Sequence, residues 1–221
     1  MYRMYALCTR KSRFPMSVNF HIDGFNLYHS LDRLGDDRLK WLDHNKLAKT
    51  LLRAGESLGH VHFFTAVVTW DRVKQQRHTS YLKALRAVGV NVEESNFRKQ
   101  PRHCFEMNRL CKFREEKKTD VAIATKLLSD AYERNCERAV LLTSDSDQVP
   151  TVLAARAANT DLEISLLLPP REGPTATELG SLFAGKNRKV LKAGLLHRCL
   201  LPRDVYSAGG RKMATRPAPY A

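Results

Sequence analysis

The chain has 221 residues, and 43% of them are hydrophobic, which is enough for a folded core and excludes a wholly disordered chain. Its 37 Lys and Arg against 23 Asp and Glu give a formal net charge of +14, so nucleic acid is the first partner to consider. Five cysteines without regular spacing predict no disulfide framework, and no apolar stretch of the sequence is long enough to span a membrane. We therefore expect a cytoplasmic protein.

The first fifteen residues lack the apolar run of a secretory signal and the periodicity of a core element. Met16 lies two residues before the first strand-like run, so we expect residues 1–15 to be an extension outside the core, with Met16 as the natural start. The sequence predicts one domain over residues 16–206, with a basic insertion at 98–118, and a basic C-terminal tail over 207–221.

Five apolar runs predict strands at Val18–Ile22, Val61–Val68, Val90–Glu93, Ala139–Thr143 and Glu163–Leu168. Helical patterns separate these runs, and such alternation predicts a parallel sheet with helices on both faces. Right-handed crossovers place the carboxyl ends of all parallel strands at one edge, which is where ligands bind in this class of fold.

Six helices are expected between and after the strands: Asn26–Leu34, Asn45–Gly55, one that begins near the cap Asp71, Asp120–Asn135, Thr151–Ala158 and Thr177–Leu191. Apolar spacing in two of them predicts the side chains that face the sheet: Val73, Tyr81, Leu82, Leu85 and Val88 in the third helix, and Val121, Ala124, Leu128, Ala131 and Tyr132 in the fourth.

The insertion from Arg98 to Lys118 carries eight Lys and Arg against three Glu and shows no regular pattern, so we expect an irregular connection. One interpretation is a clamp for a phosphate backbone, with Arg98, Lys99 and Arg102 as contacts and Phe97, Phe105 and Phe113 available for stacking on bases. The alternative is a solvated insertion without a binding role. A zinc site at His103, Cys104 and Cys111 is a weaker hypothesis, because a second cysteine pair is missing.

Four aspartates lie at predicted junctions between elements. Asp23 ends the first strand, Asp145 and Asp147 follow the fourth, and Asp120 begins a helix. Each alone is an ordinary helix-cap residue. Because the first and fourth strands can be neighbours at the switch point of a doubly wound sheet, we expect all four to converge. Four carboxylates suit Mg²⁺ or Mn²⁺, and in a basic protein the natural substrate is a phosphodiester attacked by a metal-activated water.

The segments VNFHIDGFNLYHSL and EKKTDVAIATKLLSDAYERNCERAVLLTSDSDQVPTVLAAR together resemble the NYN domain family, a branch of the PIN-like nuclease superfamily. The resemblance covers roughly Val18 to Leu168. It implies an α/β fold: a three-layer α/β/α PIN-like (Rossmann-like) domain with a central parallel sheet of strand order 3-2-1-4-5. It also implies an acidic metal pocket at the strand ends and hydrolysis of nucleic acid, most often RNA.

Residue by residue, the resemblance assigns Asp23, Asp120, Asp145 and Asp147 to the metal and catalytic aspartates and Asn26 to the asparagine of the opening motif. Lys118 matches the basic residue before the TDV helix, and Ser144 lies where a phosphate or a metal-bound water is met. Gln148 departs from the family, in which an aromatic residue commonly stands there. That departure changes the packing expected beside the pocket, but all four acids remain.

The sequence therefore predicts a metal-dependent endoribonuclease that uses Mg²⁺ or Mn²⁺, with Lys118, Ser144, Arg98, Lys99 and Arg102 as substrate contacts. Two alternatives stay open: a non-catalytic RNA-binding or adaptor protein that retains the fold, and a structure-specific DNA nuclease. The sequence names neither the target nor the pathway, and it leaves open whether two copies form a homodimer.

Overall fold

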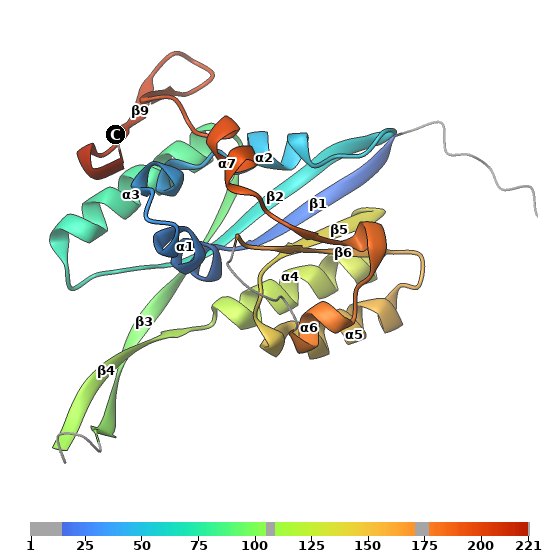
Figure 1. The fold of residues 1–221 in the computed structure, drawn as a ribbon, viewed down its shortest axis with the longest axis horizontal. Helices are drawn as coiled ribbons and strands as arrows, with labels where there is room; N and C mark the ends of the chain where they lie inside the picture. Colours follow the sequence, from blue (N-terminus) through green and yellow to red (C-terminus); the bar gives the residue numbers. More distant parts are fainter. Residues whose placement is uncertain (1–14, 105–108, 171–176, 221) are drawn as a thin grey trace, which may run out of the picture.

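The computed structural model describes residues 15–104, 109–170 and 177–220 (Figure 1), and for residue 96 and the stretches 98–104 and 109–117 it describes the backbone alone. The N-terminal extension apart from Pro15, and Phe105, lie outside the described residues. None of the described helices is both long and apolar enough to cross a membrane.

A seven-stranded sheet forms the centre of the molecule, in the order β4-β3-β2-β1-β5-β6-β7. Its strands are β1 (Met16–Asp23), β2 (Glu56–Val67), β3 (Asn91–Cys104), β4 (Arg109–Lys117), β5 (Arg138–Leu142), β6 (Glu163–Leu168) and β7 (Arg188–Val190). All neighbours pair in parallel except β3 and β4. The six parallel strands are β3, β2, β1, β5, β6 and β7. Numbered among themselves along the chain, they have the order 3-2-1-4-5-6. This order confirms the predicted α/β fold and adds one strand, β7, at an edge.

Helices cover both faces of the sheet (Figure 1). One face carries α1 (Gly24–Arg33), α2 (His44–Thr50), α3 (Arg72–Ala87) and α7 (Ala193–Arg198), and the other carries α4 (Thr119–Glu133), α5 (Val149–Ala158) and α6 (Glu178–Ser181). The described residues also form four short 3₁₀ helices: η1 (Asp37–Trp41), η2 (Ser146–Gln148), η3 (Gly185–Asn187) and η4 (Ala218–Tyr220).

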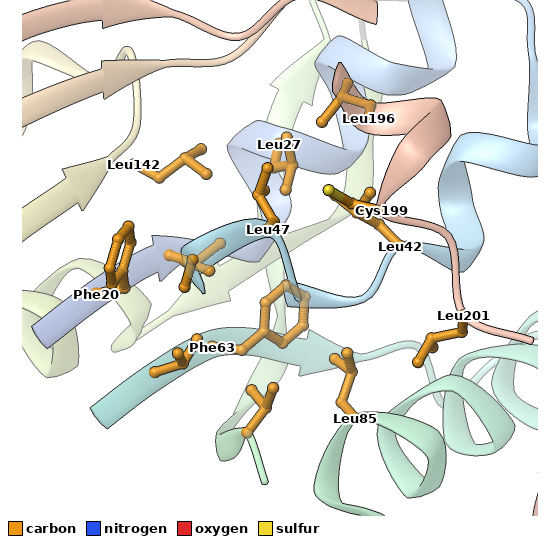
Figure 2. Packing of buried hydrophobic residues seen from close by; sticks show 14 of the residues in the cluster. Phe20, Leu27, Leu42, Leu47, Phe63, Leu85, Leu142, Leu196, Cys199 and Leu201 are labelled. Carbon is orange, nitrogen blue, oxygen red and sulfur yellow. The ribbon is translucent and has the colours of Figure 1, made fainter. Parts of the chain in front are cut away.

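Each helical layer has its own hydrophobic core. Figure 2 shows the larger one, in which Phe20 of β1 and Phe63 of β2 meet Leu47 of α2 and Leu85 of α3. On the other face, Leu141 of β5 packs with Ile123 and Leu127 of α4. Strands buried on both faces read as continuous apolar runs, which is why the strands of the sheet centre are visible in the sequence.

The predicted faces of α3 and α4 were partly wrong. Asp71 caps α3 as expected, by accepting hydrogen bonds from the backbone N–H groups of Val73 and Lys74, but the side chain of Val73 is 62% exposed. In α4, Val121 and Tyr132 are exposed, and Ile123, Leu127 and the charged Asp130 are buried instead. Apolar residues lie on more than one side of α4, so their period alone does not identify the buried face.

The expectation of an irregular insertion was wrong, because β3 and β4 pair as a long antiparallel hairpin from Asn96 opposite Lys117 to Cys104 opposite Arg109. β2 pairs with β3 only as far as Asn96, so the rest of the hairpin is a two-stranded ribbon that projects from the body (Figure 1). Because neither face of this ribbon packs on the hydrophobic cores of the described residues, its strands do not need alternating apolar and polar residues. The sequence of the insertion therefore gives no sign of a strand. The ribbon also tolerates Pro101, since one edge of β3 is unpaired there.

The predicted helix Thr177–Leu191 was also wrong. That stretch forms the short helix α6, then η3, then the edge strand β7. Further on, β8 (Asp204–Tyr206) and β9 (Lys212–Thr215) form an antiparallel pair, and Ser80 of α3 donates a hydrogen bond to the carbonyl of Thr215 at 3.2 Å. Residues of the expected basic tail therefore pack against α3.

Candidate functional site

The site lies at the carboxyl ends of β1 and β5, which are neighbours in the sheet. Ile22 pairs with Leu142, so Asp23 and Thr143 leave the sheet side by side. The chain turns from β1 directly into α1 at Gly24, where an added Cβ would come within 2.6 Å of the carbonyl oxygen of Phe64. Only glycine fits this close approach, and the turn holds Asp23 at 4% exposure.

Hydrogen bonds fix Asp23 between α1 and the loop after β5. One carboxylate oxygen of Asp23 accepts from the backbone N–H of Asn26 at 2.9 Å, and the other accepts from the Thr143 hydroxyl at 2.9 Å. The Thr143 hydroxyl oxygen in turn accepts from the N–H of Asp145 at 3.1 Å. Thr143 was not among the predicted site residues, although its place directly after a strand of this edge signals it.

A second pair of residues joins the same two segments. The side-chain oxygen of Asn26 accepts from both the N–H and the hydroxyl of Ser144, at 3.0 Å each. Asp145 caps η2 by accepting from the N–H of Asp147 at 3.0 Å. Asn26 and Ser144 thus hold the loop of Asp145 and Asp147 against the start of α1.

Two of the four aspartates, Asp23 and Asp120, lie close enough to the others to feel their charges. Burial raises the pKa of Asp23 to about 6; hydrogen bonds from Asn26 and Thr143 oppose this shift, and the charges of Asp120 and Asp145 add to it. The pKa of Asp120 is also raised, first by burial and then by the charges of Asp145 and Asp147. The topology therefore gathers four acids that are up to 124 positions apart in the chain.

The donor chemistry of this cluster fits a hard divalent cation, because carboxylate oxygens are the ligands that Mg²⁺ and Mn²⁺ prefer, and a cation relieves their repulsion. As the side chains lie, however, no group of three or more His, Cys, Asp or Glu within the described ranges is spaced to hold a metal. Asp120 and Asp147 are exposed, and rotation of exposed side chains between staggered conformers is cheap.

Gln148 is buried at the side of the cluster, at 1% exposure. Its side-chain NH₂ donates to the backbone carbonyl of Asp120 at 3.4 Å, whereas its side-chain oxygen is buried without a hydrogen-bond partner among the described residues. Gln148 thus fills the space between η2 and the start of α4. Hydrogen bonding by its side chain acts to lower the pKa of Asp120, but burial and the charges of Asp145 and Asp147 raise that pKa by more.

The predicted basic contacts are placed only in part. Lys118 is exposed and adopts a left-handed conformation, with φ of 82°, at the start of α4. Arg98, Lys99 and Arg102 lie on β3, where they face Glu115, Arg114 and Cys111 across the ribbon. Their side chains lie outside the described part of the chain, as do those of Phe113 and of the zinc candidates His103, Cys104 and Cys111.

A cavity of about 380 Å³ lies directly beside the cluster, and Gly24 and Phe25 form part of its wall. Sequence reasoning missed it, because its aromatic side chains come from several separate elements. Phe97 is the one member that the sequence had offered for base stacking.

A model of the NYN domain matches residues 17–182, which is most of the chain and includes all four aspartates. The chain belongs to the NYN domain family. This membership confirms the resemblance read from the two motifs, and NYN domains as a family indicate a PIN-like nuclease.

One relative of this NYN protein and one protein of similar fold are informative. It is 24% identical to the 6-hydroxy-3-succinoylpyridine 3-monooxygenase HspA of Pseudomonas putida, over 92% of this chain and 75% of the relative. Its fold is similar to that of a crystal structure of a protein of unknown function from Vibrio parahaemolyticus. That similarity has a TM-score of 0.57 at 16% identity and covers 86% of this chain and 99% of the other. The second likeness concerns the fold alone.

Proposed function

We propose that the protein is a metal-dependent endoribonuclease that hydrolyses RNA phosphodiester bonds. The observation that carries the proposal is the proximity of Asp23, Asp120 and Asp145 at the carboxyl ends of β1 and β5, where burial, first of all, and then the charges of Asp120 and Asp145 raise the pKa of Asp23. Membership of the NYN family supports hydrolysis of nucleic acid, and the formal charge of +14 supports a polyanionic substrate.

In this mechanism Asp23, Asp120, Asp145 and Asp147 would hold Mg²⁺ or Mn²⁺. The bound metal supplies an activated water and neutralises the charge that develops on the leaving oxygen. Thr143 keeps the carboxylate of Asp23 aimed at the cluster, and Asn26 holds the loop of Asp145 in place through Ser144. Lys118 and the basic ribbon of β3 and β4 bind the phosphate backbone of the RNA.

The direct test is cleavage of labelled single-stranded RNA by the purified protein with Mn²⁺. We expect Asp145→Asn to lower the cleavage rate by at least about 100-fold. Mutation of a residue that only hydrogen-bonds to a metal ligand already lowers activity by up to about 100-fold, and Asp145 is proposed as a ligand itself. Asp161→Asn is the matched control: it removes an exposed acid before β6, at the opposite edge of the sheet, and retains activity.

Equal cleavage by wild type and Asp145→Asn would reveal a contaminating nuclease and reject the proposal. Two further measurements address the alternatives. Calorimetry with Mn²⁺ shows no heat of binding if the protein is a non-catalytic binder without a metal pocket. Paired substrates that differ only in the sugar distinguish an RNA nuclease from a DNA nuclease, because attack by an activated water does not require the 2′-hydroxyl.

A second candidate function is oxygenation of a small pyridine compound, the activity in the name of the Pseudomonas relative. The aromatic cavity beside Asp23 favours it, because its volume of about 380 Å³ is within the range of small-molecule sites. The test is incubation with 6-hydroxy-3-succinoylpyridine, dioxygen and a nicotinamide reductant. Oxidation of the reductant that depends on the pyridine compound supports this candidate, and its absence rejects it.

A further inference from the structure

The cavity beside the aspartates is bounded by α1, α3 and the carboxyl half of β2. Its wall begins one residue after Asp23, at Gly24 and Phe25, and reaches Thr65 and Ala66 near the end of β2. Whatever occupies it therefore lies next to the predicted reaction centre.

Aromatic rings form both the mouth and the floor of the cavity. At the mouth, Phe25 is 43% exposed, and the ring of Phe97 lies 6.5 Å from that of Phe25 and 4.9 Å from that of Trp70. On the floor, the ring of His44 stacks on Phe63 with centroids 4.7 Å apart. Flat apolar surfaces of this kind bind planar rings by stacking.

His44 adds an unused hydrogen-bond acceptor to this floor. The Tyr81 hydroxyl donates its single hydrogen to the carbonyl of Leu42 at 2.8 Å, so the contact of 2.9 Å between that hydroxyl and Nε2 of His44 requires Nε2 to be the donor. Burial lowers the pKa of His44 to about 3 and keeps the ring neutral. Its Nδ1 therefore carries a lone pair, and it is buried without a partner among the described residues.

The charged side chains that the described residues place on the wall are positive. Of the described residues, those that line the cavity include Lys40, Lys74 and Arg77 and no carboxylate. Lys40 is already paired with Asp32 and Asp37. Lys74 lies 4.0 Å from Asp71 and has an exposed side chain, and Nε of Arg77 is buried without a hydrogen-bond partner in the described part of the chain. Lys74 and Arg77 remain available to an anion.

Together these features define the ligand: a planar nitrogen heterocycle with an N–H or amino donor, attached to an anionic group. We propose that the cavity holds one unpaired base of the nucleic-acid substrate, in the nucleotide next to the bond that is cleaved. The base stacks among the aromatic rings and donates to His44, and a phosphate of the strand meets Lys74 and Arg77. This inference rests on the proposed nuclease function and adds a base-binding subsite to it.

The test uses the full-length protein and a labelled single-stranded RNA in which an abasic residue is moved along the strand. We expect loss of one base near the cleavage point to weaken binding about tenfold, as is typical of base–aromatic stacking. Phe25→Ala is expected to weaken binding of the intact RNA similarly and to remove the difference between intact and abasic strands. Tyr132→Ala, which deletes an exposed aromatic residue of α4 outside the cavity, leaves both affinities unchanged.

The subsite is rejected, and the nuclease function stands, if the wild type cleaves RNA but neither an abasic residue at any position nor Phe25→Ala changes the affinity for RNA. If no RNA is cleaved, the nuclease is rejected, and titration of the Trp70 fluorescence still tests the cavity. Tighter binding of a nucleoside 5′-monophosphate than of the nucleoside or of ribose 5-phosphate then supports a nucleotide site. Tighter binding of pyridine-3-carboxylate than of every nucleotide, without displacement by RNA, identifies a free aromatic acid as the occupant and overturns the inference.

Discussion

At the scale of single residues, Asp23 shows how a site can cost stability. The carboxyl group is nearly out of water, and its pKa rises from 3.8 to about 6 through burial and the charges of Asp120 and Asp145. A raised pKa means that the ionised form is disfavoured in the folded state. The cost is absent below pH 3.8, grows as the pH rises toward 6 and is fully present above that, where it amounts to about 3 kcal/mol.

We therefore expect Asp23→Asn to stabilise the metal-free protein. Asparagine caps a helix as well as aspartate does, so the start of α1 is retained. The expected gain in the free energy of unfolding is up to about 3 kcal/mol at pH 7.5 and much smaller at pH 4. Urea denaturation in the presence of a chelator measures both values.

Asp161→Asn serves as the control for this comparison, since Asp161 is 79% exposed and leaves the unfolding curve unchanged at either pH. A gain for Asp23→Asn of the same size at pH 4 and pH 7.5 contradicts the explanation by ionisation. Loss of stability at both values shows that the hydrogen bond from Thr143 contributes more than the buried charge costs.

At the scale of elements, α4 is fixed to the sheet by a buried charge. Asp130 has no exposed side-chain surface; Asn19 of β1 donates to it at 2.8 Å, and Nζ of Lys126 and Nε2 of His21 lie 3.1 Å from its oxygens. Burial acts to raise the pKa of Asp130, but these partners outweigh it and lower the pKa below the usual range. The network orients the helix that carries Asp120.

Asp130→Ala leaves buried polar groups without their partner, which typically costs about 3–5 kcal/mol. We expect a corresponding fall in the urea midpoint at pH 7, together with loss of RNA cleavage as the start of α4 shifts. Asp161→Ala breaks the exposed pair with Arg134 instead and has little effect. An equally small effect of Asp130→Ala means that packing alone holds α4.

These elements also show what a single sequence can reveal. The strands at the sheet centre were predictable, because buried parallel strands need long apolar runs. Their order was predictable only through the resemblance to the NYN family. Asp23 and Asp145 were predictable as neighbours, because they follow the first and fourth strands, which can lie side by side at the switch point of a doubly wound sheet. Asp130 was not, since only its distant partners Asn19 and His21 make burial of a carboxylate acceptable. The cavity escaped prediction because its rings come from segments as far apart as Phe25 and Tyr220.

At the scale of the whole molecule, the excess positive charge is unevenly distributed. Residues 98–115 contain six Lys and Arg and two Glu, so this part of the ribbon holds four of the fourteen net positive charges in eighteen residues. Beyond Asn96 the ribbon pairs only with itself. Its removal therefore leaves the parallel strand pairs of the sheet and both cores intact, which makes it possible to separate binding from folding.

We expect replacement of residues 98–115 by Asn-Gly, a tight-turn pair, to leave the melting temperature unchanged and to weaken RNA binding. The logarithm of the binding constant falls with the logarithm of salt concentration by about 0.7 for each phosphate contact to a single strand. For four lost contacts, the slope of this line for the shortened protein is expected to be less steep by about 2 to 3.

The control for this deletion removes the same net charge from exposed positions of the body, by changing Lys46, Lys49, Lys189 and Lys192 to Gln. If the ribbon contacts the phosphates directly, only the deletion changes the slope, because released counterions report contacts and not total charge. Equal slopes for the two variants mean that the ribbon acts through the overall field of the protein. In that case the strand is held by the body alone, at the edge where Asp23 and Lys118 lie.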